Sequence, residues 1–280
     1  MHAVVSLIDD NSDEGARWKL CAHRALANAF SRKREWRMAM MSLERMLPLV
    51  ETATRVELAD SNSATASVPG AQILLQAAYQ TEILSVQGRY LLHAGAVAEA
   101  ASLFQTAKFD WEKATTDAGK TAAFALEKHR AVQHAPAQVL VNDGLLCFAY
   151  ANYDQSIECF KNATDRLRSS GLSADYQKED WVGPAVLGVA PHASLFNECI
   201  NNMAICALYT CRMPEAVSLM ESLIREDPTA FLTERVAFNL CTLYELGCDT
   251  TASARKKRVL QLVAKRFFLH DVGPESFRIN

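Results

Sequence analysis

Histidine and cysteine are the side chains of this chain best suited to metal binding or nucleophilic chemistry, but their spacing favours neither. His129 and His134 lie five residues apart, as do Cys206 and Cys211. Side chains on one helical face are three or four residues apart, and a zinc site built from cysteines needs closer pairs with a second pair nearby. We therefore interpret these residues as solvated histidines and buried cysteines.

Sequence motifs of common enzymes are absent as well. The chain contains no glycine-rich phosphate loop, no G-x-S-x-G elbow and no H-E-x-x-H pair. Acidic residues are plentiful, but without a fold a carboxylate pair cannot be told from a solvated helix face. We expect a protein that is not an enzyme and needs neither a cofactor nor a metal.

Two basic runs are candidates for recognition rather than catalysis. One is Ser31-Arg32-Lys33-Arg34, and the other extends from Arg255 to Arg258. Each suits phospholipid head groups, nucleic acid or an acidic protein surface, and each also fits ordinary solvated surface. Neither is interleaved with aromatic residues, and the net charge of the whole chain is -3, so we do not expect nucleic-acid binding.

The elements that would carry these residues are helices, and the region from Leu195 to Arg235 shows their spacing best. Two apolar stripes at helical period run through Ile200, Met203, Ala204, Ala207 and then Met213, Ala216, Met220, Leu223. Small residues at Ala204 and Ala216 let two antiparallel helices approach closely. Pro228 stops the second helix. Two helices and a proline stop within about 34 residues are the tetratricopeptide pattern.

Weaker copies of this pattern occur upstream in the same register. The small residues at the expected helix crossings are Ala27 and Ala39, Gly88 and Ala100, and Gly144 and Ser156. We predict an all-α fold, a tetratricopeptide-like right-handed α-solenoid of helical hairpins with insertions between units, forming a single domain over 1–280. The units lie near 20–50, 81–108, 137–168 and 197–228, and a charged hairpin at 231–268 caps the C-terminal end. An all-helical domain without a true repeat is the alternative.

The segments between the units have different compositions. Residues 59–70 are small and polar, which predicts a mobile loop. Residues 109–133 are rich in Ala, Lys and Glu, which predicts a long or extra helix. Residues 169–193 contain Gly, Pro and Trp181, which favours an ordered loop that folds back on the protein.

A solenoid of this kind binds partners on the face lined by the first helix of each pair. The residues one turn from the packing stripe form the candidate partner-binding groove: Val141, Leu145, Phe148, Ile205, Leu208 and Tyr209. They are largely apolar, which indicates either a partner segment laid in the groove or an insertion, such as the one with Trp181, that covers it.

The corresponding positions of the first three units invite comparison with a carboxylate clamp, by which chaperone-binding tetratricopeptide domains grip a peptide C-terminus. The first unit offers Arg24 and Asn28. The next two offer Ser85 and Arg89, then Gln138 and Asn142. That set is too incomplete to predict chaperone binding.

Composition is compatible with one large helical domain. The chain has 280 residues, of which 50% are hydrophobic and 22% charged. Its eight cysteines mostly occupy apolar helix positions, which favours free thiols in a reducing compartment. No apolar run approaches the length of a membrane-spanning helix, and the first 15 residues do not read as a secretory signal.

The last third of the chain resembles a known family. In order it contains NNMAICALY (201–209), REDP (225–228), ERVAFNLCTLYEL (234–246) and ARKKRVLQLVA (254–264). Together these segments resemble the C-terminal tetratricopeptide-repeat region of the trafficking protein particle (TRAPP) complex subunit 12 family. The resemblance covers roughly residues 195–265, and the family's long N-terminal extension has no counterpart here.

The resemblance implies a non-catalytic scaffold within a cytoplasmic vesicle-tethering complex that activates a Rab-type GTPase in endoplasmic-reticulum-to-Golgi traffic. Its partners would be other subunits of that complex, and any membrane contact would be peripheral, at the endoplasmic reticulum or Golgi. The matched residues look structural: Phe238, Leu240 and Tyr244 are spaced to pack on the preceding hairpin. The alternative is a free-standing tetratricopeptide adaptor or co-chaperone.

Overall fold

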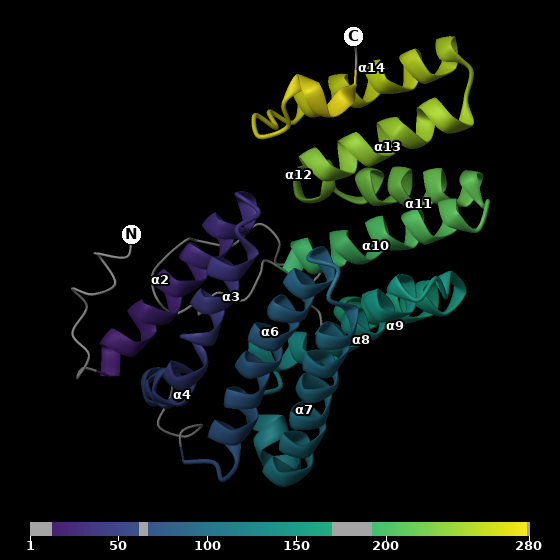
Figure 1. Cartoon of the computed structure of the whole chain (residues 1–280). Coiled ribbons are helices and arrows are strands. Elements are labelled where there is room, and N and C mark those ends of the chain that lie inside the picture. The colour runs from purple at the N-terminus through teal and green to yellow at the C-terminus, as the bar shows by residue number, and fades with distance from the viewer. Residues whose placement is uncertain (1–12, 62–66, 170–191, 279–280) are drawn as a thin grey trace. The chain divides into compact units, whose positions relative to one another are not determined.

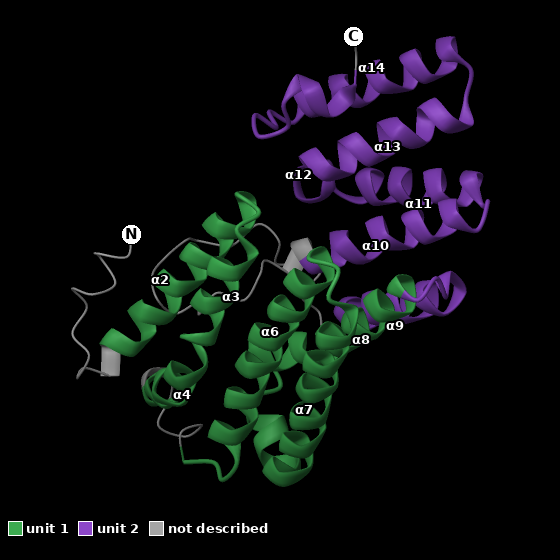
Figure 2. Cartoon of the chain, in the orientation of Figure 1, with its two compact units in different colours: residues 1–149, 178–190 green, residues 150–177, 191–280 purple. Residues whose placement is uncertain are grey.

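The computed structural model describes residues 13–61, 67–169 and 192–278, and across these residues the protein is all-α (Figure 1). The predicted fold class is thereby confirmed at its coarsest level: the described residues contain helices and no strand. The chain forms two compact units. Unit 1 comprises residues 1–149 with 178–190, and unit 2 comprises 150–177 with 191–280 (Figure 2).

Unit 1 begins with three successive helices, α2 (Asp13–Arg32), α3 (Trp36–Glu44) and α4 (Leu47–Ser61). Helix α2 packs against both α3 and α4. The sequence predicted only the first two of these helices, and placed the start of a loop at Ala59, where α4 is still helical. The remainder of that loop falls partly on residues 62–66, which lie outside the described part of the chain.

The rest of unit 1 is built on the long pair α6 (Ala71–His93) and α7 (Val97–Ala125), with α8 (Arg130–Ala149) packed against both. Helix α7 covers most of the predicted long helix and breaks at Gly119, whose φ of 73° is left-handed. The contact between α6 and α7 requires a small residue at Gly88. A Cβ placed there would lie 2.2 Å from the Phe104 ring, so only glycine lets α6 and α7 approach this closely.

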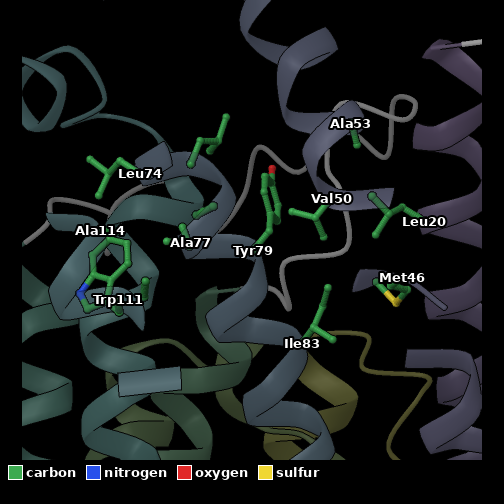
Figure 3. Close-up of a cluster of buried hydrophobic side chains, with 14 of the residues drawn as sticks. Leu20, Met46, Val50, Ala53, Leu74, Ala77, Tyr79, Ile83, Trp111 and Ala114 are labelled. Atoms are coloured by element: carbon green, nitrogen blue, oxygen red, sulfur yellow. The ribbon is translucent and has the colours of Figure 1, made fainter. Parts of the chain in front are cut away.

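One hydrophobic core links these helices. Figure 3 shows Leu20 of α2 and Val50 of α4 together with Ile83 of α6 and Trp111 of α7. Ala27 and Ala39, the small residues predicted at the first crossing, are both fully buried. The small residues of this apolar stripe are therefore turned inward, as helical periodicity predicts.

Unit 2 contains α9 (Tyr153–Ser169), α10 (His192–Tyr209), α11 (Met213–Glu226), α12 (Pro228–Phe231), α13 (Glu234–Gly247), α14 (Thr250–Arg266) and the 3-10 turn η2 (Pro274–Phe277). Packing follows chain order: α10 lies against α9 and α11, α11 against α13, and α13 against α14 (Figure 1). Ala204 and Ala216 are fully buried where α10 meets α11. Ser156 is fully buried as well and accepts a hydrogen bond from the Cys206 thiol of α10 at 3.4 Å.

The predicted domain boundaries stay a prediction. The units proposed near 20–50, 81–108 and 197–228 correspond to helices that pack as neighbours. The unit at 137–168 consists of α8 and α9, which belong to different compact units. The insertion with Trp181 lies outside the described residues, apart from its two ends.

Candidate functional site

An open groove on unit 2 lies between α11 and α14, with α13 beneath it, and encloses about 360 Å³. Its floor is apolar and comes from all three helices: Ile224, Leu240, Leu260 and Val263. Leu240 is fully buried, whereas Val259 at the edge is 60% exposed. The groove thus offers apolar surface at a recessed base and along one wall.

Local sequence fixes the helices that form the groove. Asp227 is extended and accepts hydrogen bonds from the backbone amides of Thr229 and Ala230, which starts α12 directly after α11 ends. Thr233 caps α13 through the amide of Val236, and the Asp249 side chain caps α14 through the amide of Ala252. Each cap satisfies amides that a helix start leaves without partners, so the turns between the helices are well defined.

The polar rim of the groove centres on one carboxylate. Glu221 accepts hydrogen bonds from the Tyr244 hydroxyl at 3.0 Å and Lys256 at 3.2 Å, and Arg225 lies 2.7 Å from its other oxygen. The Lys256 ammonium also sits 4.7 Å above the Tyr244 ring. Burial raises the pKa of the Tyr244 hydroxyl well above 10, and the Glu221 carboxylate raises it further, so Tyr244 is a neutral donor.

Cations outnumber anions along this rim. Arg225, Arg255 and Lys256 line the groove, while Glu221 is the one acidic side chain among the described residues that form it. Helix α14 as a whole contains six Lys or Arg residues and neither Asp nor Glu. The groove is therefore positively charged although the full chain carries a net charge of -3.

One cation of the basic run has an internal role. Lys257 is 7% exposed and bonds both the Glu245 carboxylate and the backbone oxygen of Arg278. The hydrogen bond from Lys257 holds the pKa of Glu245 below its usual value. Arg278 also pairs with Glu245 at 3.1 Å, so this cluster ties α13, α14 and η2 together. In contrast, Arg255 and Arg258 point into solvent.

The side chains that line the groove are apolar, cationic or already hydrogen-bonded. The described residues of its lining include no histidine, cysteine or serine, and Glu221 is already engaged by three donors. Across the described ranges, no group of three or more His, Cys, Asp or Glu side chains is placed to hold a metal ion. Apolar floor and cationic rim together fit a surface for macromolecular recognition.

The sequence-predicted groove residues of unit 1 have little exposed surface. Val141 of α8 is 1% exposed, so its side chain offers almost nothing to a partner. Leu145 and Phe148 are partly buried. Helical spacing identified one face of α8, but it could not tell whether neighbouring helices cover that face.

The residues predicted in unit 2 divide between core and surface. Leu208 packs against the unit 2 core and Ile205 is partly buried. Tyr209 is 59% exposed and stacks on Tyr153 with ring centroids 5.0 Å apart. The two predicted sets lie in separate compact units, and the groove of α11, α13 and α14 includes none of them.

Four of the residues compared with a carboxylate clamp are engaged inside unit 1, whereas Asn28 is exposed. Arg24 pairs with Glu82 at 2.6 Å, and both side chains are largely buried. Gln138 donates to Asn142 at 3.3 Å, and Asn142 donates to Ser85 at 2.7 Å. These residues form an internal polar network instead of an open binding face.

Sequence reasoning singled out the basic run on α14 but missed the groove beside it. The available signal was the alternation of Arg255 and Arg258 with Val259 and Leu262, which leaves apolar and cationic residues on one helical face. Phe238, expected to pack on the preceding hairpin, is 44% exposed beneath the Arg278 guanidinium, whereas Leu240 and Tyr244 are buried as predicted.

Comparison with known proteins gives two related matches, both partial. The chain is 35% identical over 75 residues to human trafficking protein particle complex subunit 12, a stretch that covers 27% of this chain and 10% of the human protein. It is 37% identical over 67 residues to the mouse protein of the same name, covering 24% and 8%. The chain thus spans about a tenth of the length of the curated relatives it matches. No protein-family model matches it.

Among the described helices, none is long and apolar enough to cross a membrane. Taken with these comparisons, the chain is all-α over its described residues and is partially similar to a subunit of the trafficking protein particle complex.

Proposed function

We propose that this chain is a non-catalytic scaffold of tetratricopeptide-like hairpins that binds other subunits of a TRAPP-type vesicle-tethering complex. The observation that carries the proposal is the similarity to subunit 12 of that complex in two mammals. The resemblance of the last third of the chain to the family's C-terminal repeats extends the proposal to a cytoplasmic role in endoplasmic-reticulum-to-Golgi traffic. Exchange chemistry on a Rab-type GTPase would reside in other subunits.

The packing of unit 2 supports a scaffold of stacked hairpins. Its helices contact their neighbours in chain order, and fully buried alanines lie where α10 meets α11. Repeat proteins of this kind are held together by contacts between adjacent elements, and they use their extended surfaces for protein recognition. The right-handed superhelix and the tetratricopeptide assignment belong to this proposal.

The residues compared with a carboxylate clamp already have internal partners, which supports the role of a complex subunit over that of a co-chaperone. Arg24 is neutralised by Glu82, and Asn142 is 1% exposed. A peptide carboxylate would have to displace internal partners that a low-dielectric interior makes strong. Titration with a peptide that has an acidic free C-terminus, and with its amidated form as control, tests this choice. Binding that depends on the free carboxylate would favour the co-chaperone.

Affinity purification of the tagged chain from its own cells, followed by mass spectrometry, tests the proposal. We expect several TRAPP subunits to be recovered in constant proportion. The Ala216→Arg variant should lose them, because Ala216 is fully buried between helices, whereas Ala254→Arg at an exposed position should keep them. Recovery of no TRAPP subunit with the parent chain would contradict the proposal.

A further inference from the structure

The geometry points to an acidic amphipathic helix of a protein partner as the occupant of the groove between α11 and α14. This inference deepens the proposed scaffold function, on which it rests, by assigning the chemistry of one partner. The groove combines an apolar base on three helices with a rim of cations. An amphipathic helix laid in such a groove contacts the base through apolar residues one turn apart and the rim through its flanking polar residues.

The charge of the groove rim indicates that the partner segment is acidic. Glu221 is 21% exposed and already faces Arg225, Lys256 and Tyr244, so it neutralises part of the rim and has little capacity to attract a further cation. Arg225 is 73% exposed, Lys256 is 42% exposed, and Arg255 is exposed with them. A partner with Glu or Asp beside its apolar stripe would therefore be attracted, and a basic one repelled.

The position of the exposed apolar residues and the length of α14 indicate the shape of the partner segment. Val259 is 60% exposed at the edge of the groove, and the floor below it reaches Leu240, which is fully buried in the core. Helix α14 has 17 residues, which corresponds to a length of about 25 Å. A partner helix of four or five turns lying alongside would cover Val259 and place acidic residues opposite Arg255 and Lys256.

The recessed floor favours a helix over a lipid surface. A flat bilayer would meet the outward stripe of α14, which consists of the exposed Arg258 and the 63% exposed Leu262, neither of which lines the groove. It would not reach Leu240 or Ile224 at the base. The two stripes lie on one helix, so matched substitutions can separate a groove ligand from a surface ligand.

A displayed peptide library on the purified chain tests the inference. Each peptide has about 18 residues, with leucines fixed at helical spacing and Glu, Lys, Gln or Ala allowed equally at the flanking positions. We expect Glu to be enriched over Lys after selection. Selected peptides should bind Arg255→Glu/Val259→Glu at least about tenfold more weakly than the parent.

Arg258→Glu/Leu262→Glu is the matched control, because it makes the same charge change and a similar apolar change on the outward stripe of α14. It should keep binding within about twofold of the parent. All four substituted side chains are exposed, so both variants should melt with the parent chain. If the groove variant unfolds, Arg255→Gln alone serves instead, with an expected loss of about threefold to fivefold.

Three outcomes would overturn the inference: no enriched peptide, enrichment of Lys over Glu, or equal weakening by the two double variants. Sedimentation with phosphatidylcholine vesicles containing about 30% phosphatidylserine tests whether the chain binds a membrane surface instead. Vesicle binding that is lost in the control variant, together with an empty selection, would assign α14 to a membrane. Peptide selection uses the purified chain alone, whereas co-purification uses the chain in its own cells. An empty selection therefore counts against the groove inference only, and a failed co-purification counts against the proposed function only.

Discussion

One polar cluster in each compact unit makes the comparison: that of unit 1 is internal, and that of unit 2 lies beside a groove. In unit 1 a chain of hydrogen bonds runs through the interior, from Gln138 to Asn142, from Asn142 to Ser85, and from Ser85 to the backbone oxygen of Thr81. In unit 2 a polar cluster around Glu221 lies on the rim of a groove. Internal networks fix how helices pack, whereas surface clusters are available to a partner.

Exposed apolar residues follow the same division. Unit 1 exposes Phe109 and Phe124, but the break at Gly119 separates them along α7. Unit 2 exposes Val259 and Leu262 within one turn of α14 and beside the basic run. We therefore place the proposed recognition surface on unit 2, beside the basic run of α14.

The largest expected effect is on the packing of unit 2. Ala216→Arg places a long charged side chain where no solvent reaches, so overpacking and charge burial act together. We expect a loss of about 3–5 kcal/mol in the free energy of unfolding, measured by denaturant titration. Ala254→Arg, at an exposed position of α14, should change it by less than about 0.5 kcal/mol. Equal stability of both variants would place Ala216 outside a helix crossing.

The second prediction concerns the internal network of unit 1. Asn142→Ala removes the acceptor of Gln138 and the donor to Ser85, and leaves buried polar atoms without partners. We expect a loss of about 2–3 kcal/mol. Adding Ser85→Ala and Gln138→Leu should restore part of the loss, since an apolar set of similar shape leaves fewer buried polar groups unsatisfied. Additive losses across the three substitutions would show that the network is not coupled.

The third prediction concerns the closest helix approach in unit 1. Gly88→Ala should destabilise by about 1–2 kcal/mol, because its Cβ would collide with the Phe104 ring and this cost exceeds the gain in helix propensity. In a Phe104→Ala background the same change should be neutral or stabilising. A double-mutant cycle measures the difference, and a coupling energy near zero would mean that the two helices separate freely at this point.

The smallest predicted effect appears at high pH and compares the two units directly. The Tyr244 hydroxyl bonds Glu221 in unit 2 and the Tyr79 hydroxyl bonds Glu57 in unit 1, and burial raises both pKa values above the usual 10. A raised folded pKa means that the stabilising contribution is full below pH 10 and is lost as pH rises through the folded pKa. Tyr244→Phe and Tyr79→Phe should each lose about 1 kcal/mol at pH 7.

Above pH 10, the free energy of unfolding of each variant should fall less steeply with pH than that of the parent. Denaturant titrations between pH 7 and 11 would measure this difference. A steeper dependence in either variant would mean that the phenol is not the group that titrates.

Periodicity predicted much of the fold and little of the site. The stripes through Ala204 and Ala216 identified α10 and α11 because helical spacing is a local property of the chain. The same spacing selected Val141 as a groove residue, although it is buried, since whether a face is covered depends on helices far away in sequence. Asn142 and Ser85, which are 57 residues apart, could not be paired from sequence for the same reason.

The basic run on α14 shows the same limit within four residues. Arg255 and Arg258 are exposed, but Lys257 between them is buried against Glu245 and the backbone of Arg278. From the sequence, all of them were expected to lie together on the surface. Only the placement of α13 and η2 separates a structural cation from the cations available to a partner.

Cross-linking mass spectrometry on the complex purified with the tagged chain tests most directly the claim that unit 2 carries recognition. Lysine-reactive cross-links to TRAPP subunits should concentrate at Lys256 and Lys265 of unit 2. Lys113 and Lys120 of unit 1 should give few, although both are exposed to the reagent and Lys256 is only partly exposed. Partner cross-links confined to unit 1 would contradict the account.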